Sequence, residues 1–194
     1  MSRGGKIGIG VVVVFGVLVI FWGAANVTET IQQYRLPSAS MEPTYSVGDK
    51  VMVGRNGFPF SRAGRGDVVI TYGPEGASET ATVQCEDERP GRPCAKATPG
   101  RLDATKFIKR IVAMGGDRVR IDAGRAAVNG KRLNEPYARL DAACELCNLP
   151  TEITVPPDYV FLLGDNRGES LDSRVYGPVP EDWIIGKVLF KYAG

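Results

Sequence analysis

The sequence predicts a mainly β protein with a small second β lobe, preceded by one transmembrane helix. Beyond residue 28, the apolar residues come in short runs rich in valine and isoleucine, bounded by glycine, proline or aspartate. Asn129 and Gly130 stand between two extended segments, and Asn-Gly in this setting is the strongest short signal for a β-hairpin. No long amphipathic helical pattern follows the amino-terminal segment. We therefore expect short strands folded into a barrel-like or sandwich core.

The amino-terminal segment is an uncharged apolar run from Ile7 to Thr28. A helix rises about 1.5 Å per residue, so roughly twenty residues cross a hydrocarbon core about 30 Å thick. The run therefore predicts a membrane anchor over residues 7–25. A cleaved secretory signal that ends at the small residues 23–25 is the alternative, and the length of the run favours the anchor.

The charges around this run predict its orientation. Arg3 and Lys6 precede it, whereas Glu29 is the first charged residue after it. Because positive charges stay on the cytoplasmic side, residues 1–6 are expected inside the cell. Residues 29–194 are then expected to form an exported domain.

The strand predictions cover most of the exported part. Each predicted strand is short, rich in β-branched or aromatic residues and bounded by turn-forming residues. The predicted segments are residues 29–36, 50–53, 67–72, 106–113, 118–122, 127–133 (as a hairpin), 159–163 and 186–191. We expect residues 117–160 to form the smaller lobe and the polar stretch 73–105 to be an exposed excursion.

The composition excludes several functional classes. The chain contains no histidine, which excludes Ser-His-Asp, Cys-His and histidine-ligated metal mechanisms. Its 24 basic and 22 acidic residues give a net charge of +2, so nothing in the charge indicates a nucleic-acid partner. A nucleophile in this chain must therefore use a base other than histidine.

Four cysteines fit an exported location, because an oxidising compartment allows them to pair. Three connectivities are possible, of which the local bridges Cys85–Cys94 and Cys144–Cys147 are the simplest. A zinc site built from all four thiolates is the alternative. The oxidising compartment and the single C-x-x-C pair favour disulfides over zinc.

Lys109 is the candidate base. A lysine side chain has a pKa near 10.4 in water, and burial lowers this pKa because it disfavours the ammonium form. Lys109 lies in an apolar predicted strand, where alternation places it on one face with Phe107 and Ile111. The alternative is an edge lysine that points to water and discourages strand pairing.

Two further segments carry candidate polar groups. Residues 38–44, which include Ser38 and Ser40, lie just after Pro37 and form a restrained turn that can present a hydroxyl beside backbone N–H groups. Such a segment can also be only a loop. Residues 164–174 concentrate charges between apolar strands, and they are either a hydrogen-bonded loop or a brace that orients the lysine.

Together, these segments resemble the bacterial type I signal peptidases, which are membrane-bound serine-lysine proteases. The matching pieces, in the family's order after an anchor, are PSASMEPT, RGDVVI, FIKRIVAMGGD, GDNRGESLDSR and YGPVP. The resemblance implies a β protease domain in which Ser40 is the nucleophile and Lys109 the general base. The Ser38 hydroxyl and the Ser40 N–H would form the oxyanion hole.

The resemblance also implies supporting and substrate-binding roles. Ser170 would hydrogen-bond the Lys109 amine, while Asp172 and Arg174 would keep their loop in shape. The residues expected along the substrate and its apolar subsites, which would accept small side chains one and three positions before the cut, are Leu36, Pro37, Met41, Phe107 and Ile108.

The implied partners are the lipid bilayer and precursor proteins that carry signal peptides. The implied location is the extracytoplasmic face of the bacterial inner membrane, and no nucleic acid, cofactor or metal is expected.

Three alternative functions stay open. They are a dedicated peptidase for conjugative pilins, a self-cleaving protease related to the stress-response repressors, and a non-catalytic anchored domain that binds envelope proteins. The lack of an amino-terminal DNA-binding helix pair argues against the second.

Overall fold

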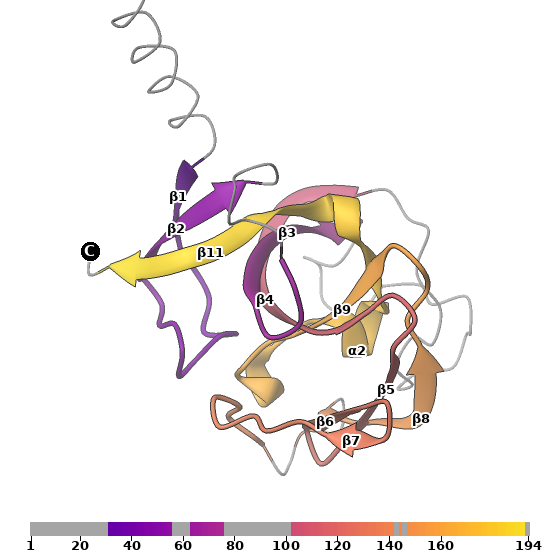
Figure 1. Cartoon of the computed structure of the whole chain (residues 1–194). Helices are drawn as coiled ribbons and strands as arrows, with labels where there is room; N and C mark the ends of the chain where they lie inside the picture. Colours follow the sequence, from indigo (N-terminus) through magenta and orange to yellow (C-terminus); the bar gives the residue numbers. More distant parts are fainter. Residues whose placement is uncertain (1–30, 56–62, 76–101, 142–143, 145–146, 193–194) are drawn as a thin grey trace, which may run out of the picture.

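The structure, a computed structural model, is mainly β and contains two antiparallel sheets (Figure 1). It describes residues 31–55, 63–75, 102–141, 144 and 147–192. The larger sheet has seven strands, in the spatial order β1 (Ile31–Arg35), β2 (Lys50–Arg55), β11 (Ile184–Tyr192), β3 (Val68–Pro74), β4 (Leu102–Met114), β9 (Tyr159–Leu163) and β10 (Val179–Pro180). The smaller sheet has four strands, in the order β7 (Lys131–Arg132), β6 (Arg125–Val128), β5 (Arg118–Asp122) and β8 (Leu149–Thr154).

Three short helical turns follow β9 in the chain. They are η2 (Arg167–Glu169), α2 (Ser173–Tyr176) and η3 (Glu181–Trp183). Among the described residues, no helix is long and apolar enough to span a membrane. The predicted anchor over residues 7–25 and the cytoplasmic residues 1–6 lie outside the described residues.

The predicted mainly β class is confirmed, with differences in detail. Strand β8 was missed because only Leu149 and Ile153 are buried in it and Pro150 interrupts the strand pattern. Proline is tolerated there because β8 is the outer strand of its sheet. The excursion predicted over residues 73–105 is too long at both ends, since β3 continues to Pro74 and β4 already begins at Leu102. The short helix α2 was not predicted.

The hairpin of the small sheet forms where the sequence predicts it. Asn129 and Gly130 connect β6 to β7 with φ values of 51° and 76°. Both residues therefore adopt the left-handed conformation that a tight turn of this kind requires, and asparagine and glycine tolerate it best. The Asn129 side chain also accepts a hydrogen bond from the Arg118 N–H, which ties the turn to β5.

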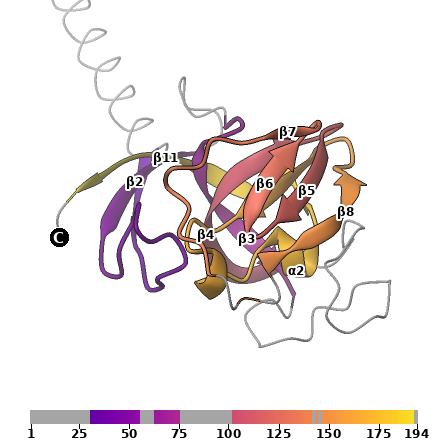
Figure 2. The same ribbon diagram turned by 90° about the horizontal axis from the view of Figure 1, so that it is seen from below.

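Strand β4 belongs to all three hydrophobic clusters of the described fold. Val112 and Ala113 pack with the small sheet and β9, Ile111 packs with Val160 and Trp183, and Ile108 belongs to the cluster around β2. Viewed from below, β5 to β8 lie together beside β3 and β4 (Figure 2). Lys109, which follows Ile108 directly, is thus held in a strand that packs in all three clusters.

A buried ion pair connects the small sheet to the loop after β9. The Arg167 Nη2 and Glu135 Oε1 atoms lie 2.6 Å apart, and neither side chain is exposed to solvent. Glu135 also accepts a hydrogen bond from the Ala126 N–H in β6, while Arg167 Nε donates to the Gly164 carbonyl. Since a buried charge is costly without a partner, this pair couples the position of the loop to the small sheet.

Candidate active site

Ser40 lies in a turn that begins just after β1 and is held by the loop after β9. The Ser40 carbonyl accepts a hydrogen bond of 3.1 Å from the Asn166 N–H, and the Asn166 side-chain amide donates to the Ala39 carbonyl. Only 5% of Ser40 is exposed. Its hydroxyl oxygen lies 3.2 Å from that of Ser38, so the two hydroxyls predicted to act together are adjacent.

Lys109 is buried in β4, with 2% of its surface exposed. Its ammonium nitrogen lies 5.7 Å from the centre of the Phe107 ring. Burial lowers the pKa of Lys109 to about 8; among the nearby charges, Asp172 raises the pKa and Arg174 lowers it. The interpretation of Lys109 as a solvent-facing edge lysine is therefore wrong. At pH 7, about a tenth of this amine is neutral and able to accept a proton.

Asp172 and Arg174 form a buried, two-point ion pair. Arg174 Nε and Nη2 each lie 2.8 Å from a different oxygen of the Asp172 carboxylate, and Asp172 also accepts a hydrogen bond from the Gly164 N–H. The carboxylate further caps α2 by accepting from the Arg174 N–H. The interpretation that these two residues neutralise each other is confirmed, and the pair fixes the loop between β9 and α2.

Gly164 marks the place where Ser40 and Ser170 come together. A side-chain Cβ at this position would lie 2.1 Å from the Ser170 hydroxyl oxygen and 2.5 Å from the Ser40 carbonyl oxygen. Only glycine allows this approach. The Ser170 hydroxyl is buried and has no hydrogen-bond partner among the described residues. The predicted hydrogen bond between the Ser170 hydroxyl and the Lys109 amine is therefore not formed in this structure.

Arg110 and Asp165 form a second brace, which the sequence analysis did not single out. Arg110 donates two hydrogen bonds to the Asp165 carboxylate, which also accepts one from the Thr44 hydroxyl in the serine turn. The Arg110 guanidinium stacks on the Tyr137 ring at 3.9 Å. Strand alternation could have indicated the brace, because it places Arg110 on the opposite face of β4 from Lys109, where a partly buried cation needs an anion.

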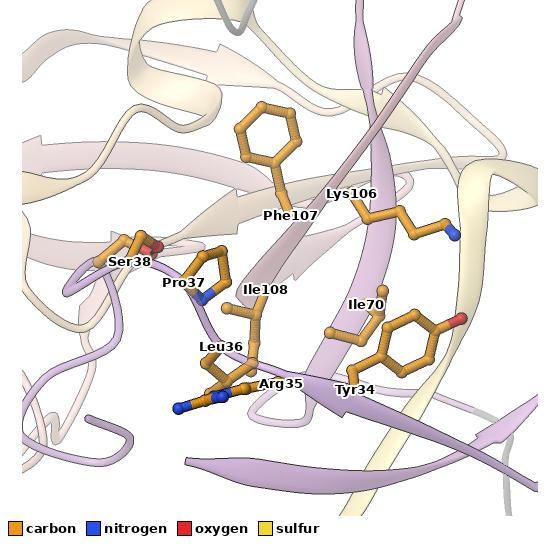
Figure 3. A pocket seen from close by; sticks show the side chains of 10 residues that line it. Tyr34, Arg35, Leu36, Pro37, Ser38, Ile70, Lys106, Phe107 and Ile108 are labelled. Atoms are coloured by element: carbon orange, nitrogen blue, oxygen red, sulfur yellow. Dashed lines mark hydrogen bonds between the residues drawn. The ribbon is translucent and has the colours of Figure 1, made fainter. Parts of the chain in front are cut away.

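A groove of about 210 Å³ runs beside this site (Figure 3). It lies between the end of β1 and the middle of β4, with Ser38 and Ser40 in its lining. The predicted subsite residues that border it are Leu36, Pro37, Phe107 and Ile108. Met41 does not border it: this side chain is fully buried in the cluster that contains Leu36 and Val51. The structure thus places Met41 beneath the groove, in the core.

Cys144 and Cys147 are joined in a disulfide, with their Cα atoms 5.3 Å apart. This is the local pairing, and it is incompatible with a zinc site that uses both thiolates. Within the described part of the chain, no group of three or more potential metal ligands comes together. Cys85 and Cys94 lie outside the described residues.

Replacing Asp172 by alanine is expected to lower the free energy of unfolding by about 3–5 kcal/mol, because the Arg174 guanidinium would stay buried without its counter-ion. Equilibrium unfolding in urea measures this loss. As a control, replacing Glu152 by alanine should change stability little, since its pair with Arg118 is largely exposed. Equal stabilities of the two variants would show that the Asp172 pair does not hold the loop.

A buried serine and a buried lysine on a β scaffold are the pair of groups that serine-lysine peptidases use for acyl transfer. The chain belongs to the signal peptidase family, because the family model "Signal peptidase, peptidase S26" matches residues 8–193.

Individual proteins similar to this chain are named signal peptidase I. The chain is 31% identical over 157 residues to "Probable signal peptidase I-2" of Synechocystis sp., covering 81% of this chain and 61% of that protein. It is 32% identical over 209 residues to "Signal peptidase I" of Mycobacterium tuberculosis, covering 90% of this chain and 69% of that protein. A solved signal peptidase I from Enterococcus faecalis matches 66% of this chain and 97% of that one, with 21% identity and a TM-score of 0.40.

Proposed function

We propose that this protein is a membrane-anchored serine endopeptidase that removes amino-terminal signal peptides from exported precursors. The single observation that carries the proposal is the burial of Lys109, which lowers its pKa to about 8 in a domain of the signal peptidase family. A lysine with an ordinary pKa could not serve as a base at neutral pH. The anchor would hold the peptidase domain at the extracytoplasmic face of the inner membrane.

The proposed reaction is an acyl transfer from the precursor to Ser40. The neutral Lys109 amine takes the proton of the Ser40 hydroxyl as its oxygen attacks the scissile carbonyl. The Ser40 N–H and the Ser38 hydroxyl, which lies 3.2 Å from that of Ser40, would stabilise the oxyanion. Lys109 then gives the proton to the leaving amine, and a water molecule hydrolyses the ester.

The supporting residues would control where the amine points. The Ser170 hydroxyl, buried and without a partner, would accept or donate a hydrogen bond at the Lys109 amine. Asp172 and Arg174 would hold Ser170 in place through the loop that they fix. The precursor would lie extended in the groove between Pro37 and Phe107 and pair its main chain with the edges of these segments.

The proposal is tested with detergent-solubilised protein and a purified exported precursor. We expect one cut, after a site with small residues at the first and third positions before it. A precursor with phenylalanine at the first of these positions is the matched control and should stay intact. A pilin precursor in the same assay distinguishes general from dedicated processing. Tight binding of the precursor without any cut would instead identify an anchored binding domain.

The same assay has an expected pH dependence. Because Lys109 must be neutral to act as a base, and burial lowers its pKa to about 8, kcat/KM should increase about tenfold per pH unit below pH 8 and level off above it. Initial rates between pH 6 and 10 measure this profile. A profile that keeps increasing about tenfold per pH unit up to pH 10, without levelling off near pH 8, would contradict the role of Lys109, because it would indicate an amine with an ordinary pKa.

A further inference from the structure

The groove has a charged end as well as an apolar one. Lys106 lines it at the end away from Ser38, and its ammonium lies on the same side as the Tyr34 hydroxyl (Figure 3). The ammonium nitrogen lies 5.6 Å from the centre of the Tyr34 ring. Lys106 and Ile108 are two residues apart in β4, so they share one face of the strand. The face of β4 that presents the predicted subsite residue Ile108 therefore also presents the Lys106 ammonium.

The cation at this end of the groove forms no ion pair within the described part of the chain. Lys106 takes part in none of the ion pairs found there. Burial raises the pKa of the Tyr34 hydroxyl, and the positive charge of Arg55 lowers it. Arg55 is therefore a second positive charge that acts on Tyr34, the ring beside the Lys106 ammonium. Arg35 also lines the groove, but its guanidinium points away from Lys106 (Figure 3).

The spacing along β4 relates this cation to a position in the substrate. An extended chain advances about 3.3 Å per residue, so the three residues from Lys109 to Lys106 span about 10 Å. A precursor whose scissile carbonyl lies at Ser40, and whose preceding residues lie along β4, would have its fourth residue before the cut beside Lys106. The long lysine side chain extends this range to the fifth and sixth residues.

We propose that Lys106 determines specificity by selecting precursors with an acidic side chain four to six residues before the cut. This inference rests on the proposed function and adds to it the charge of the preferred substrate. The Lys106 ammonium is exposed, so its pairing with a substrate carboxylate should increase kcat/KM by about two- to fivefold. The preference should largely disappear in 1 M salt, where the screening length is about 3 Å.

The test uses synthetic peptides that share one cleavage site and differ only at the fourth, fifth or sixth position before it, where each carries glutamate, glutamine or lysine. Rates are measured in neutral detergent without lipid, so that an anionic headgroup cannot occupy the cation. We expect the wild type to prefer glutamate over lysine at one of these positions. Lys106→Glu should reverse this order, and Lys106→Gln should abolish it.

Lys131→Glu is the matched control, because it makes the same charge change at an exposed position in β7 of the small sheet. It should keep the wild-type preference for glutamate. Equal rates for all peptides in the wild type, or an unchanged preference in Lys106→Glu, would overturn the specificity proposal while leaving the peptidase activity established. Failure of the wild type to cut any peptide would overturn the proposed function, and the specificity proposal with it.

Discussion

Replacing Ser40 by alanine is expected to reduce kcat for precursor cleavage by about 10⁴-fold or more, with binding of the precursor retained. The hydroxyl would be the only group that forms the ester, so what remains is the acceleration from positioning and from the oxyanion hole. Stability should change by less than about 1 kcal/mol, since the substitution removes one oxygen atom whose only side-chain hydrogen bond among the described residues is with the Ser38 hydroxyl. Single-turnover cleavage and thermal unfolding measure the two effects.

Ser38 and Ser46 are the controls for this loss. Ser38→Ala should reduce kcat by about 10²- to 10³-fold, the usual effect of removing one oxyanion donor. Ser46 lies in the same turn region but is exposed, so its replacement by alanine should leave the rate unchanged. A Ser40→Ala variant that cleaves at more than a few per cent of the wild-type rate would exclude Ser40 as the nucleophile.

Replacing Lys109 by alanine or methionine is expected to abolish turnover to a similar extent, because Ser40 would lose its proposed base. Methionine fills nearly the same space without a charge, so Lys109→Met should keep or increase stability. The increase should be larger at pH 7 than at pH 10. Below pH 8 the folded protein must bury an ammonium group, and this cost disappears as the amine becomes neutral in both the folded and unfolded states.

Lys109→Arg distinguishes a base from a mere positive charge. A guanidinium keeps its proton at any pH the protein tolerates, so this variant should be inactive across the whole profile. Activity in Lys109→Arg, or near-normal turnover in Lys109→Met, would show that proton transfer from Ser40 uses another group.

Much of the larger sheet could be predicted because the local sequence of its strands is typical of β structure. Segments such as 67–72 and 159–163 are continuous runs of β-branched and apolar residues, and each forms a strand within a residue or two of its predicted bounds. The Asn129-Gly130 hairpin follows from turn chemistry alone. Lys109 was recognisable because a charged residue in such a strand needs an explanation, and burial supplies one.

The braces could not be predicted because they join distant positions. Arg110 and Asp165 are 55 residues apart, and Arg167 and Glu135 are 32 apart, so no local pattern connects either pair. Met41 shows a related effect: its sequence neighbours lie at the groove, but its own side chain is buried in the core. These features depend on how the turn after β1 and the loop after β9 meet in three dimensions.

The membership of β4 in three hydrophobic clusters has a consequence for the chemistry of its central lysine. Lys109 is 2% exposed, and the neighbouring residues of β4 contribute to all three clusters, so separating β4 from one cluster is expected to disturb the others. Partial unfolding that would return the amine to its ordinary pKa is therefore expected to disrupt the packing of all three clusters. We therefore expect the low pKa of Lys109 to be lost only together with the fold. Unfolding should then abolish cleavage instead of broadening the range of substrates that are cleaved.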